Sequence, residues 1–112
     1  GGIQRIIAVI NGQDGIIGPR TLNWALWDES WWHGIQGSEN IVGEFEEDSD
    51  WCLEPLGFPC VARNWIIAQV NTYPNAKIII IGHSNGADGA RKVAEQLTNY
   101  NITVDLLYRC LF

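Results

Sequence analysis

Four consecutive isoleucines at positions 78–81 run directly into the sequence GHSNG at positions 82–86. A run that is apolar on both faces is typical of a strand buried in the middle of a parallel sheet. Residues 77–81 therefore predict a central parallel strand that ends in a sharp turn. Three other runs rich in β-branched residues are also predicted to be strands, namely residues 4–10, 41–45 and 102–108.

Helical signals separate these runs. Pro19 fits the first turn of a helix that extends to about Trp32. Apolar residues spaced three and four apart predict further helices over 61–72 and 85–99. This order of elements predicts one α/β domain over residues 1–112. We expect a three-layer αβα sandwich with a short, mostly parallel four-stranded sheet and right-handed crossovers.

The charge balance argues against two classes of partner. The chain has 112 residues and a net charge of −6, and its seven Lys and Arg residues are scattered along it. Without a basic stripe, neither nucleic acid nor an anionic membrane surface is an expected partner. No apolar run approaches the ~20 residues of a membrane span, and no signal-peptide pattern opens the chain, which favours a cytoplasmic location. We expect no cofactor.

The segment 34–59 is rich in acidic residues, and its later part is predicted to be a long loop. Such a loop is either a solvated surface or part of a functional site. The Asp48-x-Asp50 pattern lacks the glycine and glutamate that a calcium loop requires, so we expect no metal site. Cys52 and Cys60 bracket a stretch that a disulfide could close, but three free thiols fit the three cysteines equally well.

The GHSNG motif has the spacing of a serine nucleophile held on a strand-to-helix turn. Such a turn is so sharp that the residues two before and two after the nucleophile must lack side chains, and Gly82 and Gly86 meet that condition. Ser84 would project at the carboxyl edge of the sheet, and the N–H of Asn85 would be the first donor to an oxyanion. The alternative is a tight turn in which the serine only caps the helix.

In this context the chain resembles the α/β-hydrolase family, and most closely its lipase, esterase and thioesterase members. Residues 77–87 look like the family's fifth strand, nucleophile elbow and following helix. Residues 6–10 and the sequence NGQDG at 11–15 look like its third strand and oxyanion loop. The resemblance implies that the N–H of Gln13 is the second oxyanion donor and that His83 has a supporting role.

The resemblance also covers the remaining strands. Residues 41–45 and 104–108 look like the family's fourth and sixth strands, which implies a spatial order of second, first, third, fourth for the strands of this chain. The chain would then be a minimal or truncated member that ends after the sixth-strand equivalent. The NGQDG sequence also has a simpler interpretation, because Asn-Gly and Asp-Gly are common turn formers.

The general base of such a hydrolase is unassigned. The family order is Ser, then Asp or Glu, then His, but no histidine follows Ser84. His83 is turned away by its position beside the nucleophile, and His33 would lie roughly 20 Å away at the far end of a crossover helix. The other candidates are carboxylates expected near the same sheet edge, namely Asp14, Glu46, Glu47, Asp48, Asp50 and Asp88. A carboxylate would be a weak base unless burial raised its pKa.

Three tryptophans, Trp24, Trp27 and Trp31, would share one face of the first predicted helix. We expect this face to pack on the sheet. It could instead line an acyl pocket, or form an interface between copies of the chain, because aromatic residues are enriched at interface cores. A homo-oligomer is therefore one expected assembly.

The motif and the resemblance together predict a serine hydrolase that acts on a carboxylic ester or thioester of a small acyl substrate. Ser84 would attack the acyl carbon, while the N–H groups of Asn85 and Gln13 bind the oxyanion. The alternative, from another functional class, is a non-catalytic hydrolase-like module for binding or assembly. The missing histidine favours that alternative.

Overall fold

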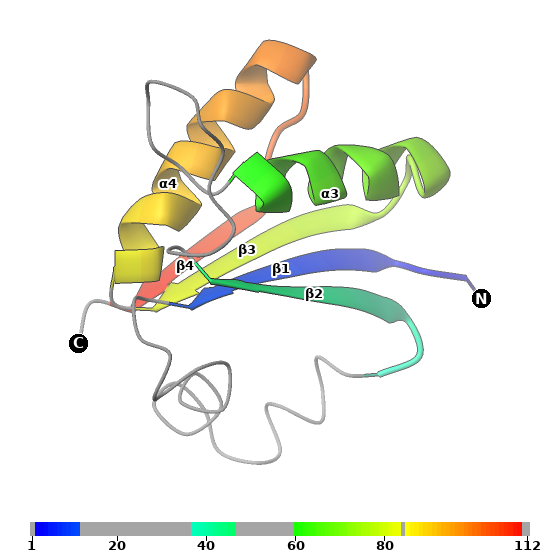
Figure 1. The fold of residues 1–112 in the computed structure, drawn as a ribbon. Coiled ribbons are helices and arrows are strands. Elements are labelled where there is room, and N and C mark those ends of the chain that lie inside the picture. The colour runs from blue at the N-terminus through cyan, green and yellow to red at the C-terminus, as the bar shows by residue number, and fades with distance from the viewer. Residues whose placement is uncertain (1, 12–36, 47–59, 84, 111–112) are drawn as a thin grey trace.

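The computed structural model describes residues 2–11, 37–46, 60–83 and 85–110 (Figure 1). Its strands are β1 (Arg5–Asn11), β2 (Asn40–Glu46), β3 (Lys77–His83) and β4 (Leu106–Cys110). All three strand pairs are parallel, and the order across the sheet is β2-β1-β3-β4. The predicted parallel sheet and its strand order are thus confirmed. The buried isoleucine run lies in β3, one of the two inner strands, as predicted.

The last strand begins later than predicted. Residues 102–105 are not part of β4, although residues 102–108 were expected to be one strand. Asn101 adopts a left-handed backbone conformation, and the N–H of Ile102 donates to the carbonyl oxygen of Leu97. The segment after the helix that ends at Leu97 therefore first caps the C-terminal end of that helix. It joins the sheet only at Asp105, whose N–H donates to the carbonyl oxygen of Ile78.

Two helices, α3 (Cys60–Thr72) and α4 (Asn85–Leu97), match the helices predicted over 61–72 and 85–99, and a short 3₁₀ turn, η1 (Thr98–Tyr100), follows α4. Both helices cover the same face of the sheet (Figure 1). Ile66 of α3 and Val93 and Leu97 of α4 are fully buried against this face. The rings of Phe45 and Trp65 meet edge to face at 5.5 Å, which joins β2 to α3.

The other face of the sheet is also buried. Ile7, Val9 and Ile81 are at most 1 % exposed and pack with Val42 and Ile79. Neither α3 nor α4 covers this face (Figure 1). The predicted helix over 19–32, and with it the third layer of the sandwich, lies outside the described residues.

Candidate functional site

The carboxyl ends of all four strands meet at one edge of the sheet because every strand pair is parallel. Asn11 is in register with Glu46, and His83 is in register with Cys110. This edge is where open α/β sheets place their ligand sites, in particular where neighbouring connections leave in opposite directions. Here that point lies between β1 and β3. The next strand after β1 is β2, which lies on one side of this pair, and the next strand after β3 is β4, which lies on the other side.

The GHSNG motif lies at this point. β3 ends at His83 and α4 begins at Asn85, so that one residue, Ser84, connects strand to helix. The predicted change from strand to helix at this motif is therefore confirmed. Ser84 itself lies outside the described residues, and its chemical role stays a prediction. Asn85, the predicted first oxyanion donor, is the first residue of α4, where backbone N–H groups have no partner within a helix.

Gly82 allows α4 to start this close to the strand. A Cβ on Gly82 would lie 2.7 Å from Cα of Ala87 and 2.8 Å from Cβ of Ala90, and it would overlap the carbonyl oxygen of Gly86. Gly86, Ala87 and Ala90 are all buried. Any side chain at position 82 would therefore push the first turn of α4 away from β3. The predicted need for a glycine before the turn has a direct structural cause.

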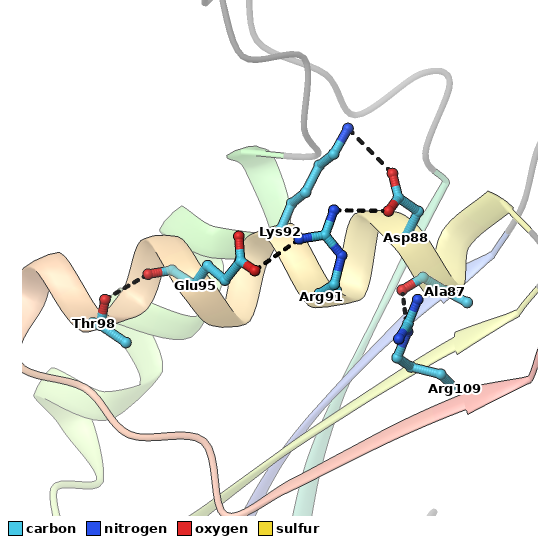
Figure 2. A network of polar contacts seen from close by, with 7 residues as sticks. All are labelled: Ala87, Asp88, Arg91, Lys92, Glu95, Thr98 and Arg109. Atoms are coloured by element: carbon cyan, nitrogen blue, oxygen red, sulfur yellow. Dashed lines mark hydrogen bonds and ion pairs between the residues drawn. The ribbon is translucent and has the colours of Figure 1, made fainter.

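The first turn of α4 is also held from outside the motif, as Figure 2 shows. Arg109, which is in register with Gly82, donates from Nε to the carbonyl oxygen of Ala87 at 3.1 Å. Asp88 accepts from Arg91 at 2.9 Å and forms an ion pair with Lys92 at 3.2 Å. The role of Arg109 has no signal in the sequence, because its contact depends on the register of β4 against β3.

The ion pairs of Asp88 make it a poor candidate for the general base. Hydrogen bonds from Arg91 and Lys92 hold the pKa of the Asp88 carboxyl below its ordinary value of 3.8. A carboxylate stabilised in this way is a weaker proton acceptor than an ordinary one. Asp88 lies in the first turn of α4, four residues after Ser84, as predicted, but its carboxylate is engaged on the helix surface.

Glu46 lies at the correct edge but not beside the motif. It ends β2, and β1 separates β2 from β3. At the ordinary strand spacing of ~4.8 Å, the backbones of Glu46 and His83 are about 10 Å apart. Among the carboxylates that the structure describes, Glu44 of the same strand has a raised pKa, because partial burial disfavours its charged form. Glu44 was not a predicted site residue, and its position inside a β-branched run was the only signal of burial.

His83 is 7 % exposed and lies at the end of β3. Side chains alternate across a strand, and position 82 faces α4, so His83 lies on the opposite face of the sheet. It is thus on the other side of the sheet from the start of α4. This geometry argues against His83 as the base for Ser84, and its supporting role stays a prediction.

Many predicted site residues lie outside the described residues. They are Gln13, Asp14, Trp24, Trp27, Trp31, His33, Glu47, Asp48, Asp50, Cys52 and Ser84. Cys60 forms a disulfide, so the interpretation of three free thiols is wrong. Cys52, the proposed partner, is among the residues not described. Within the described ranges, no group of three His, Cys, Asp or Glu side chains is arranged to hold a metal ion.

No family model, no curated protein and no solved structure matches this chain. The α/β-hydrolase resemblance therefore depends on the motif and its place in the fold. Among the described helices, none is long and apolar enough to cross a membrane.

Proposed function

We propose that this protein is a serine hydrolase that cleaves a carboxylic ester or thioester, with Ser84 as the nucleophile. The observation that carries the proposal is the one-residue connection between β3 and α4 at Ser84, with Gly82 packed against Gly86 and Ala87. A connection this short exposes the middle residue of the turn at the sheet edge and aims the helix start at the same place.

The reaction would proceed in two steps. Ser84 Oγ attacks the acyl carbon, and its proton is transferred through a base to the departing alcohol or thiol. An acyl-serine remains, which water then hydrolyses to the free acid and the restored serine. The N–H groups of Asn85 and Gln13 would bind the oxyanion in both steps, and the positive end of the α4 dipole would favour the same charge.

The first turn of α4 is fixed in position, which suits a site that binds an oxyanion. An oxyanion donor is effective only when its position is fixed before the reaction, because reorientation during the reaction costs free energy. The bond from Arg109 to Ala87 and the packing of Gly82 both hold the residues that follow Asn85. The base stays unassigned. Asp88 is a poor candidate because Arg91 and Lys92 engage its carboxylate, and His83 is a poor candidate because it lies on the sheet face opposite α4.

A fluorophosphonate probe tests the proposal. An activated serine displaces fluoride, forms a bond from Oγ to phosphorus, and gains a mass that intact-protein mass spectrometry detects. Wild type and Ser38→Ala should both be labelled and should hydrolyse a short p-nitrophenyl ester, whereas Ser84→Ala should do neither. Ser38 is the matched control because it is an exposed serine in the turn before β2.

The competing candidate is a non-catalytic module for binding or assembly. One observation favours it: Gly82 is required for the contact between α4 and β3 whether or not Ser84 reacts. A folded wild-type chain that is neither labelled nor active would support this candidate and contradict the hydrolase proposal. Labelling that persists in Ser84→Ala would also contradict it, since another residue would then be the nucleophile.

A further inference from the structure

Among the described strands, β4 lies at one edge of the sheet (Figure 1). Its sequence, LLYRC, is unusually apolar for an edge strand. Leu106 is 51 % exposed and Tyr108 is 44 % exposed. They are in register with Ile79 and Ile81, so both lie on the sheet face opposite α4. Exposed apolar edge strands favour pairing with a further strand. We propose that β4 pairs antiparallel with β4 of a second copy, so that two sheets join into one.

Backbone groups of β4 point outward at suitable positions. The N–H of Lys77 donates to the carbonyl oxygen of Gln4, so alternate residues of β3, beginning at Lys77, bond toward β1. The residues between them, beginning at Ile78, therefore bond toward β4. Given the register of Ile79 with Leu106, the residues of β4 that bond inward are Leu106, Tyr108 and Cys110. Leu107 and Arg109 then direct their N–H and C=O groups away from β3.

The sequence of this edge is complementary to itself. When two antiparallel copies are centred on Leu107, Asp105 of each copy lies opposite Arg109 of the other, and Leu106 lies opposite Tyr108. The two Leu107 residues, whose backbone groups point outward, form a hydrogen-bonded pair at the centre. Opposite charges and apolar pairs directly across antiparallel strands both stabilise pairing.

Charge selects this register. Moving one copy by two residues relative to the other keeps the outward groups matched but places Arg109 opposite Leu107 or, in the other direction, opposite Thr103, so that the opposite charges no longer meet. Asp105 and Arg109 are both exposed. The bond from Arg109 to Ala87 uses Nε, so the terminal nitrogens of the guanidinium can meet the carboxylate of a second copy. Asp105 is the residue before β4, and it bonds to Ile78 through both its N–H and Oδ2. Its contact with a second copy would therefore involve only Oδ1 and the guanidinium of Arg109, with no backbone bond at that position.

The opposite edge of the sheet does not suit self-pairing. β2 carries Glu44 and Glu46, so two copies paired through β2 would bring carboxylates together. Like charges across strands destabilise pairing. A second copy is therefore expected at β4 rather than at β2.

Sedimentation equilibrium of the whole chain tests the pairing. The weight-average mass should rise from 12.5 kDa toward twice that value between micromolar and millimolar concentration. The double variant Leu106→Lys/Tyr108→Lys should stay at the monomer mass. Val61→Lys is the matched control, because Val61 is 42 % exposed but lies on α3, and it should associate as wild type does.

Charge variants test the register. Arg109→Asp alone and Asp105→Arg alone would each place like charges across the interface, so each should remain monomeric. An equimolar mixture of the two would pair arginines of one chain with aspartates of the other and should form a heterodimer. Asp105→Arg also removes the bond to Ile78, so its fold is checked by circular dichroism; if it fails to fold, the lysine double variant still decides the pairing.

Three results would overturn the proposal. The first is a wild-type chain that stays at the monomer mass over the whole range. The second is a Leu106→Lys/Tyr108→Lys variant that associates as strongly as wild type. The third is a mixture of folded charge variants that does not associate.

Discussion

Gly82 at the end of β3 lies so close to Ala87 of α4 that a Cβ on the glycine would be 2.7 Å from Cα of Ala87. No real side chain tolerates that approach to a backbone atom, because the backbone of a helix turn cannot move independently of its neighbours. The start of α4, and with it the position of Asn85, depends on this contact. The fold at this turn and the proposed chemistry therefore both depend on Gly82.

Gly82→Ala should destabilise the fold by about 1–3 kcal/mol, the usual cost of overpacking a buried contact. Gly2→Ala is the matched control, since nothing lies within 4 Å of a Cβ at that position, and it should stay within about 0.5 kcal/mol of wild type. Urea denaturation of the three proteins measures the difference. Equal free energies of unfolding for Gly82→Ala and Gly2→Ala would contradict the close contact.

Asp105 supplies a carboxylate oxygen 2.8 Å from the backbone N–H of Ile78 at the start of β3. Removing it in Asp105→Ala leaves that N–H without its acceptor and should cost about 1–3 kcal/mol. Asp105→Asn keeps an oxygen acceptor and should cost clearly less. Both are measured by denaturation of dilute protein, so that association does not contribute. The interpretation fails if alanine and asparagine are equally destabilising.

Glu44→Gln should make stability less dependent on pH. Partial burial raises the pKa of Glu44 above 4.5, so the native state keeps a proton that the unfolded chain has already lost. The free energy of unfolding of wild type therefore falls as the pH rises from about 4.5 through the folded pKa of Glu44. That of the Glu44→Gln variant does not change for this reason. The free energy of unfolding of the variant, minus that of wild type, should grow across this window and then level off. A difference that is constant with pH would exclude burial as the cause.

Asp88→Asn should have the opposite pH dependence. Arg91 and Lys92 hold the pKa of Asp88 below 3.8, so its stabilising effect is complete above that pH and is lost as the pH falls through the folded pKa. The variant should be slightly less stable than wild type near neutral pH and equal to it in strong acid. The effect is small because the side chain is 50 % exposed, and added salt should reduce it further. Thermal unfolding at several pH values and two salt concentrations measures it.

Local pattern was enough to predict most elements. The apolar spacing of residues 61–72 and 85–99 predicted α3 and α4 closely, and the isoleucine run predicted β3. The order of the strands followed from the resemblance carried by the GHSNG motif, and the structure confirms that order. The predicted start of β4 was wrong. Ile102 is a residue type that favours strands, but its N–H is hydrogen-bonded to the carbonyl oxygen of Leu97 at the end of α4.

The site was predicted only in part, for a related reason. Gly82 could be found from the motif, since its requirement arises from a turn only a few residues long. Arg109, which holds Ala87, and Glu44, whose pKa is raised, could not be found in this way. Their roles depend on what surrounds them in space.

For the described residues, the sequence by itself determined the helices, three of the four strands closely, and the position of the sharp turn with two glycines, because these depend on residues a few positions apart. Only the tertiary structure decided which groups meet across the sheet. Arg109 reaches Ala87 from 22 residues away, and Asp105 reaches Ile78 from 27 residues away. Contacts of this kind require parallel strands to align in one register, and that register results from the packing of the whole core.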